Sequence, residues 1–169
     1  MKIVFAVAML LAVLVSGEAR ADRTVPFGRV SYWTIYAYYD DKNQFGFCGM
    51  RTDSIDGPEV LTLSMNEGGV MMFLDSNSWS LPLGESYDVA VNIGRSAWTG
   101  KAKVYSANGV NMWWSWSQDF ADAFMAGSRM EIQFRNGRSW NVNLTGSRRA
   151  LNVLAQCLLA NNVSKNPFK

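Results

Sequence analysis

Tryptophan and tyrosine are the residue types in this chain whose spacing best indicates a binding site. Trp113, Trp114 and Trp116 fall within four residues, and Tyr36 and Tyr38 alternate in an earlier segment. Exposed aromatic rings serve as contact surfaces for proteins and as stacking platforms for sugars. On a strand, Trp114 and Trp116 share one face and Trp113 lies on the other. The same tryptophans could fill the core of a small β domain, so both interpretations stay open.

Catalytic chemistry finds little support in the residue types. The chain of 169 residues contains no histidine. It therefore has no Ser-His-Asp triad, no Cys-His pair and no histidine-ligated zinc. Asp40 and Asp41 are adjacent in a predicted turn, where neighbouring side chains usually point apart into water. We expect no enzyme, no cofactor and no metal site; a carboxylate-based hydrolase is the remaining catalytic alternative.

Two further polar patterns match known binding motifs in part. Residues 53–57 contain the Asp and Gly of a calcium loop, but isoleucine stands at the third position, where an oxygen ligand is needed. Arg135 and Arg138 flank a predicted hairpin turn, and Arg148 and Arg149 open a predicted helix. These arginines could bind an anionic partner, but charges at such places are usually solvated. We expect the solvated role.

Length and charge limit the possible partners further. The chain has 16 Lys and Arg against 14 Asp and Glu, a formal net charge of +2. A net charge so close to zero creates no electrostatic field that would attract nucleic acid or an anionic membrane. The length favours one domain with a single core.

The first 21 residues match a cleavable signal peptide. Lys2 precedes an unbroken apolar run over residues 3–15, and Ala19 and Ala21 form an A-x-A cleavage site. The run is shorter than the roughly 20 apolar residues that a membrane anchor needs. The sequence therefore predicts a signal peptide at residues 1–21, a mature chain at residues 22–169 without a membrane span, and a periplasmic or secreted bacterial protein.

The mature chain contains two cysteines, Cys48 and Cys157. An even number of cysteines in an exported protein favours a disulfide bond. Two buried and unpaired thiols are the alternative. We expect the disulfide, which would join the C-terminal helix to a strand near the N-terminus.

Alternating apolar and polar residues predict a mainly antiparallel β fold. Strands are expected at residues 29–39, 45–51, 59–65, 70–74, 87–93, 101–106, 110–116, 130–134 and 140–144, with a short piece at 79–81. Asn136-Gly137 between two alternating runs favours a type I′ hairpin. Ser117 and Ser147 are expected to cap a short helix and a C-terminal helix. Together these elements predict a single β-sandwich or partly closed barrel with both helices packed on it.

The C-terminal third resembles a known family. Residues 130–132 lead through Asn136-Gly137 to residues 142–147 and then to Ala150-Leu151. This order is similar to the end of the invasion-associated locus B family, small exported proteins of alphaproteobacteria. Residues 33–36 are similar to that family's opening tryptophan strand, although Tyr36 stands where its members usually have a cysteine. The resemblance implies a β-rich periplasmic protein without established catalysis, and it transfers no functional residues.

These observations lead to two expectations for function. The first is a non-enzymatic interaction or envelope-support protein of the periplasm, in one form related to association with a host, whose partner is another envelope protein. The second is a module that binds glycan or peptidoglycan, or inhibits an enzyme that attacks it, through Trp113, Trp114 and Trp116. The sequence does not indicate an oligomeric state.

Overall fold

The computed structural model describes residues 21–53, 57–66, 69–114 and 117–161. These residues form ten strands and two helices. Their bounds are β1 (Arg23–Val30), β2 (Trp33–Tyr39), β3 (Phe45–Thr52), β4 (Glu59–Asn66), β5 (Gly69–Ser76), β6 (Ser86–Ile93), β7 (Ser96–Ser106), β8 (Gly109–Trp114), α1 (Gln118–Ala126), β9 (Arg129–Phe134), β10 (Ser139–Asn143) and α2 (Ser147–Ala160). The predicted mainly β fold with two helices is confirmed.

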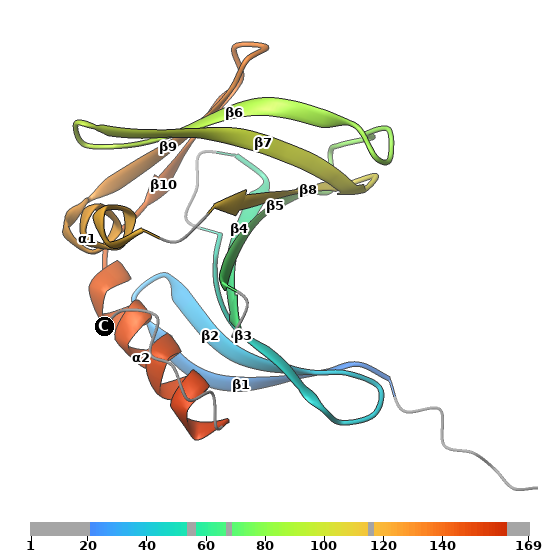
Figure 1. The fold of residues 1–169 in the computed structure, drawn as a ribbon, viewed down its shortest axis with the longest axis vertical. Helices are drawn as coiled ribbons and strands as arrows, with labels where there is room; N and C mark the ends of the chain where they lie inside the picture. The colour runs from blue at the N-terminus through green and yellow to red at the C-terminus, as the bar shows by residue number, and fades with distance from the viewer. Residues whose placement is uncertain (1–20, 54–56, 67–68, 115–116, 162–169) are drawn as a thin grey trace, which may run out of the picture.

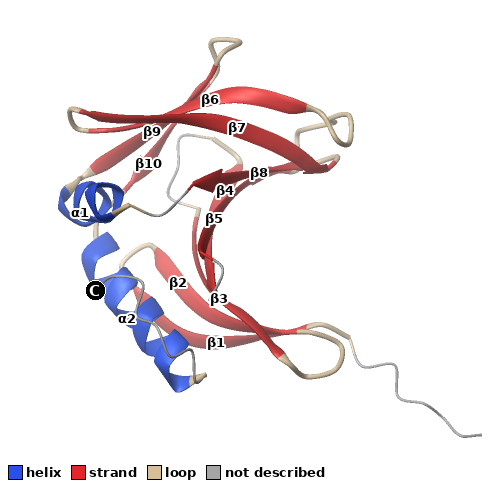
Figure 2. Ribbon diagram, in the orientation of Figure 1, coloured by secondary structure: helices blue, strands red, loops and turns tan. Residues whose placement is uncertain are grey.

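All ten described strands belong to one antiparallel sheet, in the order β1-β2-β3-β4-β5-β8-β7-β6-β9-β10. The sheet is strongly curved, and both helices lie in the opening of the curve (Figures 1 and 2). Because β1 and β10 are the two ends of the sheet, it does not close into a barrel. The expected sandwich or partly closed barrel is thus realised as one open, curved sheet.

Strand alternation sends one face of the sheet into the core. In β2, Trp33, Ile35 and Ala37 are buried, as their spacing predicts, whereas Thr34 is exposed. We call the buried face, which the helices cover, the inner face, and the opposite one the outer face. Burying a large apolar side chain contributes roughly 1.5–3 kcal/mol, so the inner face provides most of the stability.

Helix α2 closes the inner side of β1, β2 and β3. Leu151, Leu154 and Leu158 form its buried stripe at helical spacing. Cys157 of α2 is bonded to Cys48 of β3, with a Cα–Cα distance of 6.2 Å. The predicted disulfide is confirmed. In the chain-entropy model, closing a loop of this length stabilises the fold by up to about 4.7 kcal/mol.

The predicted single strand over residues 29–39 is wrong. Two strands occupy this part of the chain, and Val30 of β1 pairs with Trp33 of β2 across a tight turn at Ser31-Tyr32. Ser31 has φ +52, in the left-handed region that a non-glycine residue rarely adopts. Neither turn residue is a Gly, Asn or Asp, the types that usually mark a hairpin turn. The strand-like sequence therefore continues through the turn without a visible break.

The hairpin at Asn136-Gly137 has a different turn from the predicted type I′. The N–H of Gly137 donates to the carbonyl of Phe134 at 2.9 Å, which closes a turn over residues 134–137. Gly137 has φ +86, but Asn136 has no positive φ, as a type I′ turn would require. The loop is a three-residue hairpin with glycine at the left-handed position.

The two helices begin in different ways. Ser117 caps α1 as predicted, because its side chain accepts a hydrogen bond from the N–H of Phe120 at 3.2 Å. Ser147 does not cap α2. The N-cap is Gly146, at φ +85, and the Ser147 hydroxyl instead donates to the carbonyl of Phe124 at 2.7 Å. Ser147 therefore ties α2 to the end of α1.

The predicted signal peptide falls almost entirely outside the described residues, so the division into residues 1–21 and 22–169 stays a prediction. Within the described part of the chain, no helix is long and apolar enough to cross a membrane.

Candidate binding surface

A row of residues across the outer face connects two of the predicted binding residues. Strand by strand from β2 to β8, the register runs through Tyr36, Gly49, Ser64, Met71 and Trp113. Residues that pair directly point to the same side of a sheet. Tyr36 and Trp113 therefore lie on the same outer face, although they are far apart in the sequence.

The row continues beyond Trp113 onto β7, β6 and β9. The β7–β8 register pairs Ala102 with Met112, and extending it by one residue places Lys101 opposite Trp113. Lys101 pairs with Asp88 on β6, and the backbone N–H of Arg135 donates to the carbonyl of Asp88 at 3.1 Å. Aromatic and charged groups thus meet at the junction of β8 and β7.

Tyr36 has a packing role within the sheet. A Cβ atom added to Gly49 would lie 2.5 Å from Cζ of Tyr36, so the ring lies directly over the glycine. An aromatic ring that covers a cross-strand glycine protects backbone that has no side chain of its own. Burial raises the pKa of the Tyr36 hydroxyl above its usual value. Tyr36, a predicted binding residue, therefore lies on the outer face, but its ring packs against Gly49.

The Tyr38 ring also packs against neighbouring residues of the sheet. A Cβ on Gly46 would lie 2.9 Å from Cδ1 of Tyr38, and the ring stacks on Phe47 with centroids 4.7 Å apart. Its hydroxyl donates to Asp22 at 2.8 Å, and this hydrogen bond is the main cause of a raised pKa for Tyr38. Tyr38 thus helps to hold the first described residues against the sheet.

Tyr105 is an outer-face aromatic residue that sequence reasoning missed. It lies over Gly109, contacts Phe73 edge to face at 5.5 Å, and donates a hydrogen bond to Asp75. Burial raises the pKa of Tyr105 well above its usual value, and burial also raises the pKa of Asp75. A tyrosine that keeps its proton suits a structural hydrogen bond better than proton transfer at neutral pH. The sequence did hold a hint of this position, because Tyr105 follows Lys101 and Lys103 at every second residue and therefore lies on their face of the strand.

Trp113 differs from the tyrosines in having no such role. The side chain is 54% exposed. Among the described residues it makes no ring contact and no hydrogen bond. Met71 lies beside it on β5 and Lys101 on β7. An indole left free between an apolar and a cationic neighbour is suited to contact a partner.

The other two predicted tryptophans are not brought to this surface by anything observed. The backbone of Trp114 pairs with Val70 on the same strand pair. Trp116 lies outside the described residues. Their role as binding residues stays a prediction.

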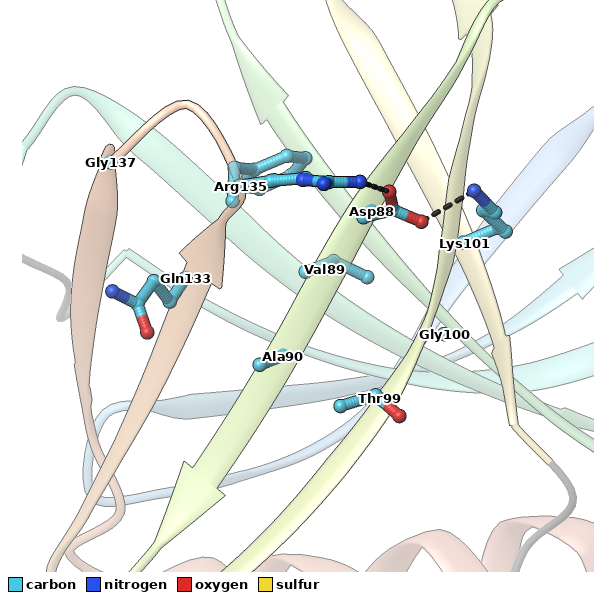
Figure 3. Close-up of a pocket in the computed structure, with 10 residues that line it drawn as sticks. Asp88, Val89, Ala90, Thr99, Gly100, Lys101, Gln133, Arg135 and Gly137 are labelled. Carbon is cyan, nitrogen blue, oxygen red and sulfur yellow. Dashed lines mark hydrogen bonds and ion pairs between the residues drawn. The ribbon is translucent and has the colours of Figure 1, made fainter.

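The outer face carries a shallow hollow of about 650 Å³, which Lys101 and Asp88 line (Figure 3). Its floor consists of small residues, Ala90, Thr99 and Gly100, from β6 and β7. Because small residues cover little of the sheet, the larger side chains around them form raised walls. The hollow is open, as expected of a site for an extended ligand rather than an enclosed one.

Charged side chains form one wall of the hollow. Asp88 lies between Lys101 and Arg135 and forms ion pairs with both, the second at 3.2 Å (Figure 3). The hydrogen bond from Lys101, followed by that from Arg135, lowers the pKa of the Asp88 carboxyl. These exposed cations keep free N–H donors, since each guanidinium or ammonium has more donors than Asp88 can satisfy. They can bind carboxylate or hydroxyl groups.

The alternative catalytic and metal sites gain no support. The Asp40 side chain accepts hydrogen bonds from the N–H groups of Lys42 and Gln44, as a turn residue does. Within the described part of the chain, no three metal-ligating side chains cluster. Three residues of the partial calcium loop, at positions 54–56, lie outside the described residues. Arg148 and Arg149 are exposed on α2, as expected.

Comparison with known proteins gives a structural relative but no sequence relative. No protein-family model matches the chain, and no curated protein matches it. The chain is similar to the crystal structure of invasion associated protein B from Bartonella henselae, with a TM-score of 0.54 and 14% identity. The match covers 81% of this chain and 99% of that chain. The two proteins share a fold, and this agrees with the resemblance in the C-terminal third.

Proposed function

We propose that this chain is an exported, non-catalytic protein of the bacterial envelope that binds another envelope protein through its outer face. The observation that carries the proposal is Trp113, a 54% exposed indole without a packing role. Exposed tryptophans cluster at the energetic centres of protein interfaces, because burying one in a complex removes a large apolar area from water.

Chemistry and compartment both support this proposal. The sequence lacks histidine, and the polar groups beside Trp113 are an exposed ion-pair cluster. Such a cluster holds no carboxyl group with a pKa near neutrality, which general acid–base catalysis would favour. The Cys48–Cys157 disulfide suits an oxidising compartment such as the periplasm or the exterior. Because the structural neighbour is an invasion associated protein, a role in host association is a narrower form of the proposal.

A glycan is the second candidate ligand, and the hollow favours it. A sugar ring stacked on Trp113 would extend over the floor of small residues toward Lys101 and Arg135. Carbohydrate sites combine an aromatic platform with hydrogen-bonding groups at the edge of the ring. Peptidoglycan also carries carboxylates, which these two cations could bind.

Crosslinking at position 113 tests the first candidate. Trp113 would be replaced by a photoreactive phenylalanine analogue in cells, and Leu159 in a control. Leu159 is 56% exposed and lies on α2, away from the outer face. We expect one discrete crosslinked protein from position 113 and none from position 159. Equal products from both positions, or none from position 113, would contradict an outer-face protein partner.

Co-sedimentation with purified peptidoglycan tests the second candidate. Wild-type protein should pellet with peptidoglycan, Trp113→Ala should stay in the supernatant, and Leu159→Ala should behave as wild type. If the crosslink appears and co-sedimentation fails, the partner is a protein. The opposite result identifies a glycan ligand.

A further inference from the structure

A second group of aromatic residues surrounds a small pocket on the inner side of the sheet. It forms where β6 and β10 begin and β9 ends, and we call it the aromatic pocket: Trp79, Tyr87, Phe134 and Trp140. Ring centroids are 5.5 Å apart for Trp79–Trp140, 5.4 Å for Phe134–Trp140 and 6.4 Å for Tyr87–Phe134. The interplanar angles of 59°, 88° and 66° make the rings enclose a space rather than stack into one layer.

The pocket is small and has a mixed rim. Its volume is about 100 Å³, well below the usual range for a drug-sized ligand. Leu81 and Val110 complete the apolar lining, whereas Asn136 and Arg138 lie where it opens to solvent. A compact group therefore fits inside, with a polar extension at the rim.

Glu59 does not line the aromatic pocket, but it lies close to Trp140, one of the rings that do. Its side chain is only 5% exposed, and within the described structure its Oε2 atom has no hydrogen-bond partner. A Cβ atom built on Gly57 would clash with Oε2 and lie 3.6 Å from Cδ1 of Trp140. The Glu59 carboxyl group and the Trp140 ring thus both lie beside Gly57. A buried carboxyl oxygen without a hydrogen-bond partner is costly, and a cation bound on the neighbouring ring would offset part of that cost.

We propose that the aromatic pocket binds an alkylammonium group and that Arg138 at the rim binds an anionic group on the same ligand. The faces of aromatic rings attract cations, and a carboxylate beside Trp140 makes the local potential more negative. Arg138 would repel a bare cation. It would instead pair with a phosphate or carboxylate a few bonds away, because a guanidinium forms bidentate hydrogen bonds with these groups. Phosphocholine and phosphoethanolamine have this arrangement of charges.

This site opens on the opposite side of the sheet from the proposed outer-face site, although Phe134 lines both hollows. Tyr87 and Phe134 point to the inner side with their strand neighbours, whereas Trp113 and Lys101 lie on the outer face. Failure of either proposal leaves the other unaffected.

Calorimetric titration of the disulfide-bonded protein with phosphocholine, phosphoethanolamine, choline and glycerol phosphate tests the proposal. We expect saturable binding of the two zwitterions, weaker binding of choline and none of glycerol phosphate. Trp79→Leu should lower the affinity for phosphocholine about tenfold, and Trp79→Phe should retain most of it. Absence of binding at about 10 mM phosphocholine and phosphoethanolamine would overturn the proposal.

Two charge variants identify the roles of Glu59 and Arg138. Glu59→Gln should weaken binding of both choline and phosphocholine without lowering the melting temperature, since the replaced Oε2 atom has no hydrogen-bond partner to lose. Arg138→Ala should lower the affinity for phosphocholine to that for choline. Arg135→Ala, on the outer face, should leave the affinities for both ligands unchanged. Binding that is insensitive to both variants would overturn the site.

A free headgroup and the headgroup of a lipid share this chemistry. Sedimentation with phosphatidylcholine vesicles, with phosphatidylglycerol vesicles as control, distinguishes the two sources. Binding to the first vesicles that is lost in Trp79→Leu identifies a lipid. Binding of soluble phosphocholine alone identifies a free ligand.

Discussion

Strands β2 and β3 and strands β7 and β8 present aromatic side chains on the same outer face but use them differently. Tyr36 covers Gly49, and Tyr38 covers Gly46 and stacks on Phe47. Trp113 covers none of the described glycines and is 54% exposed. The β2–β3 region is also covered on its inner side by α2 and joined to it by the disulfide. An aromatic-rich strand is therefore not a binding signal in itself, whereas an aromatic ring that the fold does not use is one.

Removing the disulfide should have the largest effect on stability and should confirm that the β2–β3 region is structural. We expect Cys48→Ser with Cys157→Ser to lower the free energy of unfolding by about 3–5 kcal/mol, because the unfolded chain regains its loop entropy. Urea unfolding followed by circular dichroism measures it. Partner binding through Trp113, measured far below the melting temperature, should not change. A loss below about 1 kcal/mol would show that the bond constrains the chain little.

Gly49→Ala should have the next largest effect. The added Cβ meets the Tyr36 ring, so we expect a loss of about 1–2 kcal/mol in the free energy of unfolding. In a Tyr36→Ala background the same change should instead stabilise by about 0.5 kcal/mol, because alanine restricts the unfolded chain more than glycine does. Denaturant titration of the four proteins completes the cycle. The same sign in both backgrounds would mean that the ring does not act as a cover.

Trp113→Ala should change stability less than either the loss of the disulfide or Gly49→Ala. We expect a shift within about 0.5 kcal/mol, as for other exposed residues that lack a structural role. Binding of the partner should fall at least about tenfold, as for a central interface tryptophan. Thermal unfolding and a pull-down measure the two quantities. Large destabilisation with unchanged binding would reverse the contrast between the two regions.

The ion pairs of Asp88 with Lys101 and Arg135 should have the smallest effect on stability, and this effect should depend on pH. The folded-state pKa of Asp88 is lowered by Lys101 and Arg135. The stability that ionised Asp88 contributes is therefore fully present above its pKa in the unfolded chain, about 4. It disappears as the pH falls through the lowered pKa of the folded protein. The melting temperatures of wild type and Asp88→Asn should differ slightly at pH 7 and converge in acid. A difference that grows as the pH falls would contradict this assignment.

Local patterns predicted the strands and their buried faces well. The spacing of Trp33, Ile35 and Ala37 indicated which side of β2 is buried, because side chains alternate along any strand. The disulfide followed from an even number of cysteines in a chain with a predicted export signal. The buried faces could be predicted because they depend on neighbours in sequence, and the disulfide because the two cysteines had only each other as partners.

Long-range pairing could not be read from the sequence in this way. Nothing local indicates that β8 pairs with β5 or that β6 pairs with β9. The row that joins Tyr36 to Trp113, and the hollow beside it, depend on those pairings. The glycines under Tyr36 and Tyr38 were likewise invisible, because a covered glycine and a turn glycine look alike in sequence. Glu59 appeared as an ordinary first residue of a strand, and only the fold buries it.

An open sheet has two unpaired edges, and each edge is a possible starting point for aggregation. On β1, Pro26 offers no N–H to an incoming strand, and the register shifts between Pro26 and Gly28. On β10, the exposed edge is only five residues long. Both edges are therefore poor templates for adding further copies, end to end, into a fibril. Growth along the sheet edges is thus disfavoured, and the outer face is the surface on which we propose that a partner binds.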